Sequence, residues 1–409
     1  MRFTTFQNRA ATCARICAVA LGISIPISVA LDNVLLALIL ISWLAAGDYR
    51  SQIALVMQNR VAVAAGALFC LLAAGLIHSS APAGDGLDML GKYVDLAFVP
   101  LFVCLFRDER VRRRAWLALA FALALTLILS YTAWLGVGQN SFLIMGDRGN
   151  PVVFKQYLTH SLLMAFGAFL FAHFALHAQS LRGRILWSAL ALLAAINVLV
   201  MTQGRTGQLI LAALAACLAY SVWRWRGLLL AATATAILAV ALTLGFAPAT
   251  RMSHTLAEWR DWQPGQVTET ATGLRLEFYR NSLEIVRAHP LLGVGTGGFA
   301  KVYASRVAGT DLTPTTNPHS EYLNMAMQLG VVGLVALLYL FYCQWRLAPA
   351  LPTAFEFHLA RGLIVTIALG CLFNSLLMDH VEGLFFAWAG GVLFAGLRSP
   401  PVNSGAPTR

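Results

Sequence analysis

The sequence predicts an all-α protein that crosses a membrane many times. Hydrophobic residues make up 59% of the chain and charged residues only 11%, against roughly 25% charged in soluble domains. Apolar runs recur through the 409 residues, each close to the length that spans ~30 Å of hydrocarbon as a helix. Because lipid offers no partner for backbone N–H and C=O groups, each such run must be helical.

About twelve apolar runs qualify as spans. The first two are short and are joined through Leu31, Asp32 and Asn33. The pattern divides the chain into nine spans within 1–246, a long loop at 247–322 with amphipathic helices, three spans within 323–398, and a tail at 399–409. The predicted spans are 12–28, 31–46, 60–78, 91–106, 115–136, 153–176, 185–202, 207–223, 227–246, 323–345, 357–377 and 381–397.

Basic residues predict the orientation. With a cytoplasmic N-terminus, most arginines between spans fall inside, as the positive-inside rule requires. Both termini are then cytoplasmic, and the 247–322 loop is periplasmic. The N-terminal arginines followed by the apolar run to Ser28-Val29-Ala30 also resemble a cleavable signal peptide, which would leave the later helices oriented as before. Four basic residues nevertheless fall at short outward connections, which indicates that the outer face needs positive charge: Lys92, Arg148, Lys155 and Arg205.

Composition excludes several other classes. The net charge of +11 does not indicate nucleic-acid binding, because the charges lie between apolar runs instead of clustering on a soluble domain. All seven cysteines lie in or beside apolar stretches with no CxxC pair, which argues against a disulfide framework or a zinc site. The acidic turn Asp379-His380-Val381-Glu382 stands alone on the outer face, so we predict no metal, and either an interfacial turn or a carboxylate, Asp379, that orients a histidine.

The outer loop is predicted to contain an amphipathic helix over residues 273–288, ended by His289-Pro290. Arg280 and Arg287 each have a glutamate three or four residues away, so helix-face pairs can neutralise both. Arg275 has no such neighbour and is the first choice for an anion ligand. The apolar face is formed by Leu276, Tyr279, Leu283 and Val286.

Residues 293–298 formally contain GxGxxG. A dinucleotide fingerprint needs a preceding strand and a following helix. Here a proline-terminated helix precedes the motif, so we interpret it as a tight turn that permits close backbone approach.

Asn317-Pro318-His319 is typical of a helix N-terminus. Asn is a favoured N-cap and Pro a favoured first residue, so a helix should begin here with His319 in its first turn. The positive end of the helix dipole would keep the imidazole neutral, able to accept a proton, and would attract anions. The alternatives are a simple cap or interfacial histidine; Tyr322 is likewise either an interfacial aromatic or a substrate contact.

Two further basic residues are candidate phosphate ligands. Arg205 lies in a very short turn, Thr202-Gln203-Gly204-Arg205-Thr206-Gly207, where it either reaches lipid phosphates or is held for bidentate phosphate recognition. Lys155, after Asn150-Pro151, is a weaker candidate of the same kind.

These motifs resemble a known family. His319-Ser320, nine residues, Gly330, two residues and Gly333 match the H-[NSQ]-x9-G-x-x-[GTY] pattern of bacterial O-antigen ligases, and Arg275 with residues 289–295 resembles the wider ligase/polymerase superfamily. The resemblance implies an inner-membrane glycosyltransferase of GT-C-like architecture. It implies transfer of O-antigen from undecaprenyl pyrophosphate to lipid A-core, without metal, nucleotide or other cofactor. His319, Arg205 and Arg275 match the family's essential histidine and arginines, with Arg287 as the alternative to Arg275.

The residues suit this chemistry independently of the family resemblance. A lipid pyrophosphate is a good leaving group, so the site needs mainly cations, Arg205 and Arg275, and one base, His319. The nearest alternatives are an O-antigen polymerase or a protein O-oligosaccharyltransferase, which share the donor and differ in the acceptor. A lipid-linked glycan transporter or flippase is disfavoured, because the spans carry few charges and show no convincing inverted repeat.

Overall fold

The computed structural model describes residues 2–138, 141, 143–230, 232–233, 258–265 and 270–397. Within these residues the chain is helical and contains no β-strand. Two isolated bridges, Ile144 to Val153 and Asp147 to Asn150, close one small turn. The predicted all-α fold class is therefore confirmed.

Eight of the described helices are long and apolar enough to cross a membrane. A ninth span results if α3 (Tyr49–Gln58) and α4 (Arg60–Gly75), which meet at 97°, are counted together. The eight are α1 (Arg2–Ile27), α2 (Val29–Ala46), α7 (Glu109–Trp134), α8 (Tyr157–His177), α9 (Leu181–Ile196) with its continuation to Met201, α10 (Arg205–Trp223), α15 (Glu321–Leu347) and α16 (Ala354–Phe373).

The structure does not reproduce the predicted count of twelve spans. Helices lie at the predicted spans 91–106 and 381–397, but α6 (Asp95–Leu105) and α17 (His380–Phe394) are short. A break after α5 (Ala83–Lys92) shortens α6. The predicted span 227–246 lies mostly outside the described residues, and the tail 399–409 lies wholly outside them.

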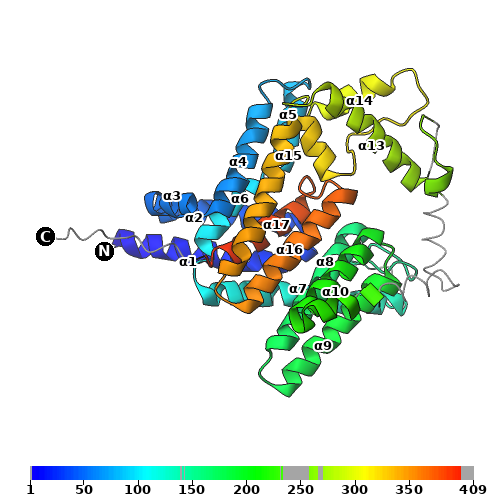
Figure 1. Ribbon diagram of the computed structural model, residues 1–409. Coiled ribbons are helices and arrows are strands. Elements are labelled where there is room, and N and C mark those ends of the chain that lie inside the picture. Colours follow the sequence, from blue (N-terminus) through cyan, green and yellow to red (C-terminus); the bar gives the residue numbers. More distant parts are fainter. Residues whose placement is uncertain are drawn as a thin grey trace.

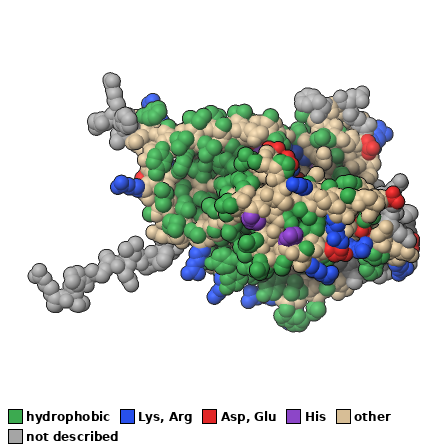
Figure 2. All heavy atoms as spheres, turned by 90° about the horizontal axis from the view of Figure 1, so that it is seen from above, with side chains coloured by type: hydrophobic (Ala, Val, Ile, Leu, Met, Phe, Trp, Pro, Cys, Tyr) green, Lys and Arg blue, Asp and Glu red, His purple; other side chains and the backbone are tan. Residues whose placement is uncertain are grey.

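Helix α17 is the centre of the bundle. It packs on α6, α16, α1 and α7, and nearly all of its side chains are buried, including Trp388, Phe385 and Phe386. A helix that is apolar on all sides is stable in such a place because protein surrounds it. In Figure 2, hydrophobic side chains gather on the left and central parts of the face, whereas many of the Lys, Arg, Asp and Glu side chains lie on its right-hand part.

The start of α1 lies on one side of the bundle, and α13 (Ala271–Ala288) and α14 (Phe299–Val307) lie on the opposite side (Figure 1). These two helices share a small core of their own with one side chain of α15, Met327. The amphipathic helix predicted over 273–288 is thereby confirmed, and it ends just before Pro290 as expected. The periplasmic placement of this unit stays a prediction. The other buried members of its core are Phe278, Ile285, Val294, Phe299, Tyr303 and Val307.

The glycine-rich turn after α13 docks where α15 is broken. Gly330 has φ 63° and ψ −153°, and a Cβ there would lie 2.2 Å from the backbone oxygen of Leu291. The turn supplies the hydrogen bonds that the broken helix lacks: Val294 N donates to Met327 O at 2.7 Å, and Val331 N donates to Pro290 O at 2.8 Å. The close backbone approach expected of residues 293–298 is confirmed, and glycine is required at Gly330 because its φ is positive.

Candidate functional site

His319 lies immediately before α15, not inside it. The helix begins at Glu321 with Ser320 as N-cap, so the predicted start at Asn317-Pro318 is wrong. The side chain of Asn317 instead folds back on its own loop, where Oδ1 accepts from His319 N at 2.8 Å and from Ser375 Oγ at 2.8 Å. Such a local turn competes with helix capping. It leaves His319 with φ 54°, a conformation that the loop must enforce.

Asn374 and Asp379 hold the imidazole. His319 Nδ1 lies 3.1 Å from Asn374 Oδ1, and Asn374 Nδ2 donates to Asp379 Oδ2 at 3.1 Å. Because the amide nitrogen of Asn374 donates to Asp379, the amide oxygen faces the histidine. The proton of the neutral imidazole is then on Nδ1, and Nε2 keeps its lone pair.

The surroundings also keep His319 uncharged. Burial is the largest effect and lowers the pKa of His319; the hydrogen bond with Asn374 raises this pKa, and the nearby Arg275 guanidinium lowers it. The histidine is therefore neutral at neutral pH, as the sequence predicted. The cause is burial and a neighbouring cation, since the side chain is outside the first turn of α15.

Helix α13 also packs against His319. The Phe278 ring stacks on the imidazole, with ring centroids 5.9 Å apart and an interplanar angle of 18°. Tyr279 Oη lies 2.9 Å from the backbone oxygen of His319 and 2.9 Å from that of Leu372. One turn earlier, Arg275 is half-buried and forms no ion pair among the described residues. Arg275, the arginine of α13 with no acidic residue three or four positions away, is thus the cation beside the imidazole.

The partners of the other arginines of α13 differ partly from expectation. Arg280 pairs with Glu277 at 3.3 Å and with Glu284 at 3.6 Å, as predicted. Glu284 also pairs with Arg306 of α14, and no Arg287–Glu284 pair forms within the described part of the chain. Arg287 is exposed, twelve residues beyond Arg275, which is about 18 Å along a helix and about 120° round it. The geometry therefore favours Arg275 over Arg287.

Arg205 is the first residue of α10 and is exposed, with no ion pair in the part of the chain described. The predicted tight glycine turn is confirmed, because a Cβ at Gly204 would lie 2.1 Å from Ser161 Oγ. A Cβ at Gly370 of α16 would lie 3.6 Å from Ile210 Cδ1, so the start of α10 faces the end of α16. Arg205 is therefore at the same end of the bundle as Asn374.

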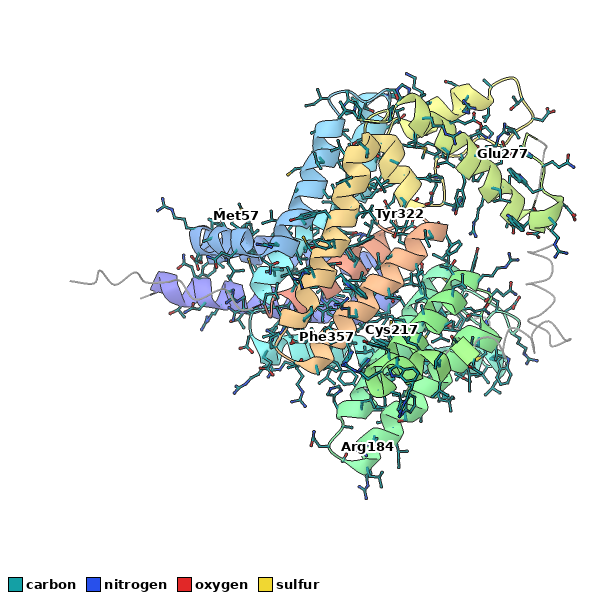
Figure 3. All side chains as sticks on the ribbon, in the orientation of Figure 1. Met57, Arg184, Cys217, Glu277, Tyr322 and Phe357 are labelled. Atoms are coloured by element: carbon teal, nitrogen blue, oxygen red, sulfur yellow. The ribbon has the colours of Figure 1, made fainter. Side chains whose placement is uncertain are left out.

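Two other candidate site residues, Lys155 and Tyr322, have neighbours within the fold that account for their positions. Lys155 is buried near Asp32 and Glu382; burial lowers the pKa of Lys155, and these two carboxyl groups raise it. The half-buried Tyr322 donates from Oη to the backbone oxygen of Ala368 at 2.8 Å, which ties α15 to α16. In Figure 3, Tyr322 lies near the end of α16, on the side of α13 and away from Arg184.

Sequence reasoning missed Asn374, Phe278 and Tyr279. Asn374 is polar and follows an apolar run, but nothing in its spacing connects it with His319. Phe278 and Tyr279 read only as parts of an amphipathic helix. In the described residues, no group of three or more His, Cys, Asp or Glu side chains could hold a metal ion.

A family model described as O-antigen ligase matches residues 189–338, a little over a third of the chain. The matched stretch runs from α9 into α15 and includes Arg205, Arg275 and His319, whereas Asn374 and Asp379 lie beyond it. No curated protein sequence matches the chain. The family match confirms the resemblance noted from the histidine motif.

Proposed function

Because residues 189–338 match the O-antigen ligase family, we propose that the protein is an O-antigen ligase of the bacterial inner membrane. It transfers O-antigen from undecaprenyl pyrophosphate to lipid A-core. The observation that carries this proposal is the His319 site: an imidazole oriented through Nδ1 beside Arg275, which has no ion pair among the described residues.

The reaction follows from the positions of these groups. His319 Nε2 removes the proton from an acceptor hydroxyl while that oxygen attacks the anomeric carbon of the donor sugar. The bond from this carbon to the phosphate oxygen breaks, and its electron pair leaves with the lipid pyrophosphate. Attack opposite the leaving group inverts the anomeric centre, and no metal or other cofactor is needed.

Arg275 and Arg205 bind the pyrophosphate. Both are at the end of the bundle where α16 meets the loop before α15, and neither has an acidic partner among the described residues. Guanidinium groups suit this role because their planar donors bind phosphate oxygens in pairs. Arg275 also disfavours the imidazolium form of His319, so one cation serves both binding and proton transfer.

The positive-inside pattern supports a periplasmic location for this chemistry, with both termini in the cytoplasm. The position of the start of α1, on the side of the bundle opposite α13 and α14, supports this arrangement (Figure 1). The long lipids would reach the site from the bilayer.

Reconstitution tests the proposal. Purified protein in vesicles is given a polyprenyl-pyrophosphate glycan and lipid A-core, and the glycosylated product is followed. His319→Ala should lower kcat by about 10²–10⁴, the usual contribution of a positioned base. Transfer at the wild-type rate by this variant would show that His319 is not the base.

The alternatives differ in the acceptor. An O-antigen polymerase would extend a second lipid-linked glycan, and a protein O-oligosaccharyltransferase would modify a hydroxyl on a protein. Supplying each acceptor in the same assay separates the three. A transporter would move glycan across the vesicle without forming a new bond; the break at Gly330 does not favour it, because residues 290–295 fill that break.

A further inference from the structure

A second group of ionisable side chains is buried behind the turn that carries Asn374 and Asp379. Asp32, in the first turn of α2, is 0% exposed, and Asp95, the first residue of α6, is 2% exposed. The imidazole of His380, the first residue of α17, lies between them. Its Nε2 is 3.9 Å from Asp32 Oδ2, and its Nδ1 is 3.7 Å from Asp95 Oδ2.

The two carboxyl groups have few other partners. Ser24 Oγ donates to Asp32 Oδ1, but Asp32 Oδ2, Asp95 Oδ1 and His380 Nε2 are buried with no hydrogen-bond partner among the described residues. A buried carboxylate without a partner is strongly disfavoured, and two side by side repel each other. The imidazole of His380 lies between the two carboxyl groups and keeps them apart.

This cluster is joined to the transfer site through the chain itself. His380 directly follows Asp379, whose carboxylate accepts from Asn374, which in turn holds His319. The turn from residue 374 to residue 380 thus has the His319 contact at one end and His380 at the other. Anchoring His380 between α2 and α6 fixes the end of the turn that carries Asp379.

We propose that Asp32, His380 and Asp95 are positioning residues for the transfer reaction, which hold the 374–380 turn so that Asn374 and Asp379 orient His319. None of the three touches the imidazole of His319, so they act only through this turn. The activity readout rests on the proposed function, whereas the structural readout below does not.

Replacement of His380 by glutamine should change how kcat depends on pH. When the carboxyl groups of Asp32 and Asp95 are protonated, they can hydrogen-bond to the new amide. When both are ionised, they repel each other with no imidazole between them and loosen the turn, and a rise in pH favours this ionised state. Other charged groups facing the cluster are Lys155 before α8, and Glu382 and Asp379 around the start of α17; they remain unchanged in this variant.

The expected result for His380→Gln is a kcat that falls relative to wild type as pH rises, on the order of tenfold at mildly alkaline pH, with KM unchanged. Adding Asp95→Asn should restore kcat, because only one of the two carboxyl groups can then ionise. The exposed His289 at the end of α13 provides the control: His289→Gln should keep the wild-type profile.

Hydrogen–deuterium exchange of the 374–380 backbone gives the independent readout. At the same mildly alkaline pH, these amides should exchange faster in His380→Gln than in wild type, and the double variant should return to the wild-type rate. Should His380→Gln not fold, His380→Lys places a cation between the carboxyl groups and should retain both the turn and kcat across the pH range.

Exchange and pH profiles of His380→Gln that superimpose on wild type would overturn the proposal. A pH-independent loss that Asp95→Asn does not restore would also overturn it, since that result indicates a general packing role. If the wild-type protein transfers no glycan, the proposed function fails, and the exchange experiment still decides the role of the cluster.

Discussion

Replacing Asn374 by alanine tests how the base is oriented. The amide contacts His319 Nδ1 at 3.1 Å and donates to Asp379 at 3.1 Å, so its loss leaves two half-buried polar groups without this partner. An unsatisfied buried group costs about 1–3 kcal/mol. At about 1.4 kcal/mol per tenfold in rate, kcat should fall about 5- to 150-fold.

The assay is initial-rate transfer in reconstituted vesicles, with donor and acceptor varied separately. The KM for the donor should stay unchanged, because the proposed role of Asn374 is to orient the base, not to bind the pyrophosphate. Asn59 is the matched control: it is buried at the start of α4, accepts from Val61 N and donates to Phe394 O at 2.9 Å. Asn59→Ala should lower thermal stability without the same loss of kcat. Full kcat in Asn374→Ala, or a raised donor KM with kcat intact, would refute the reasoning.

Four other outcomes are expected. Arg275→Gln removes the cation that lowers the pKa of His319, so the acid limb of the kcat–pH profile should move to higher pH and the donor KM should rise. Arg287→Gln should change neither, and a loss equal to that of Arg275→Gln would reverse the assignment. Gly330→Ala should lower the thermal unfolding temperature, because its φ is 63° and its Cβ would meet backbone; Gly84→Ala, with nothing within 4 Å, should not. A chelator such as EDTA should leave the transfer rate unchanged.

Local patterns in the sequence were enough to predict most of the helices. Lipid imposes one solution on a long apolar run, so α7, α8 and α16 coincide with predicted spans. The lengths of α6 and α17 depended on packing. Both are surrounded by other helices, and protein contacts allow a short segment where lipid would demand a longer one.

In the candidate site, too, local properties could be predicted from the sequence, and contacts between distant segments could not. Arg275 was predicted to be an anion ligand because it lacks an acidic neighbour on its own helix, which is a local property. The expected pairing of Arg287 with Glu284 was wrong because Arg306, on another helix, takes that carboxylate. A cation from a distant segment can pair with a carboxylate as well as a cation one helical turn away can. Spacing along one helix does not reveal such a partner.

By itself, the sequence determined that this is a helical membrane protein with a histidine motif, because hydrophobicity and helix period act over short stretches. Only the tertiary structure decided which groups meet His319. Asn374 is 55 residues away along the chain, and Phe278 lies on a separate helix. Their convergence depends on how α13, α15 and α16 pack, and packing is a property of all three surfaces together.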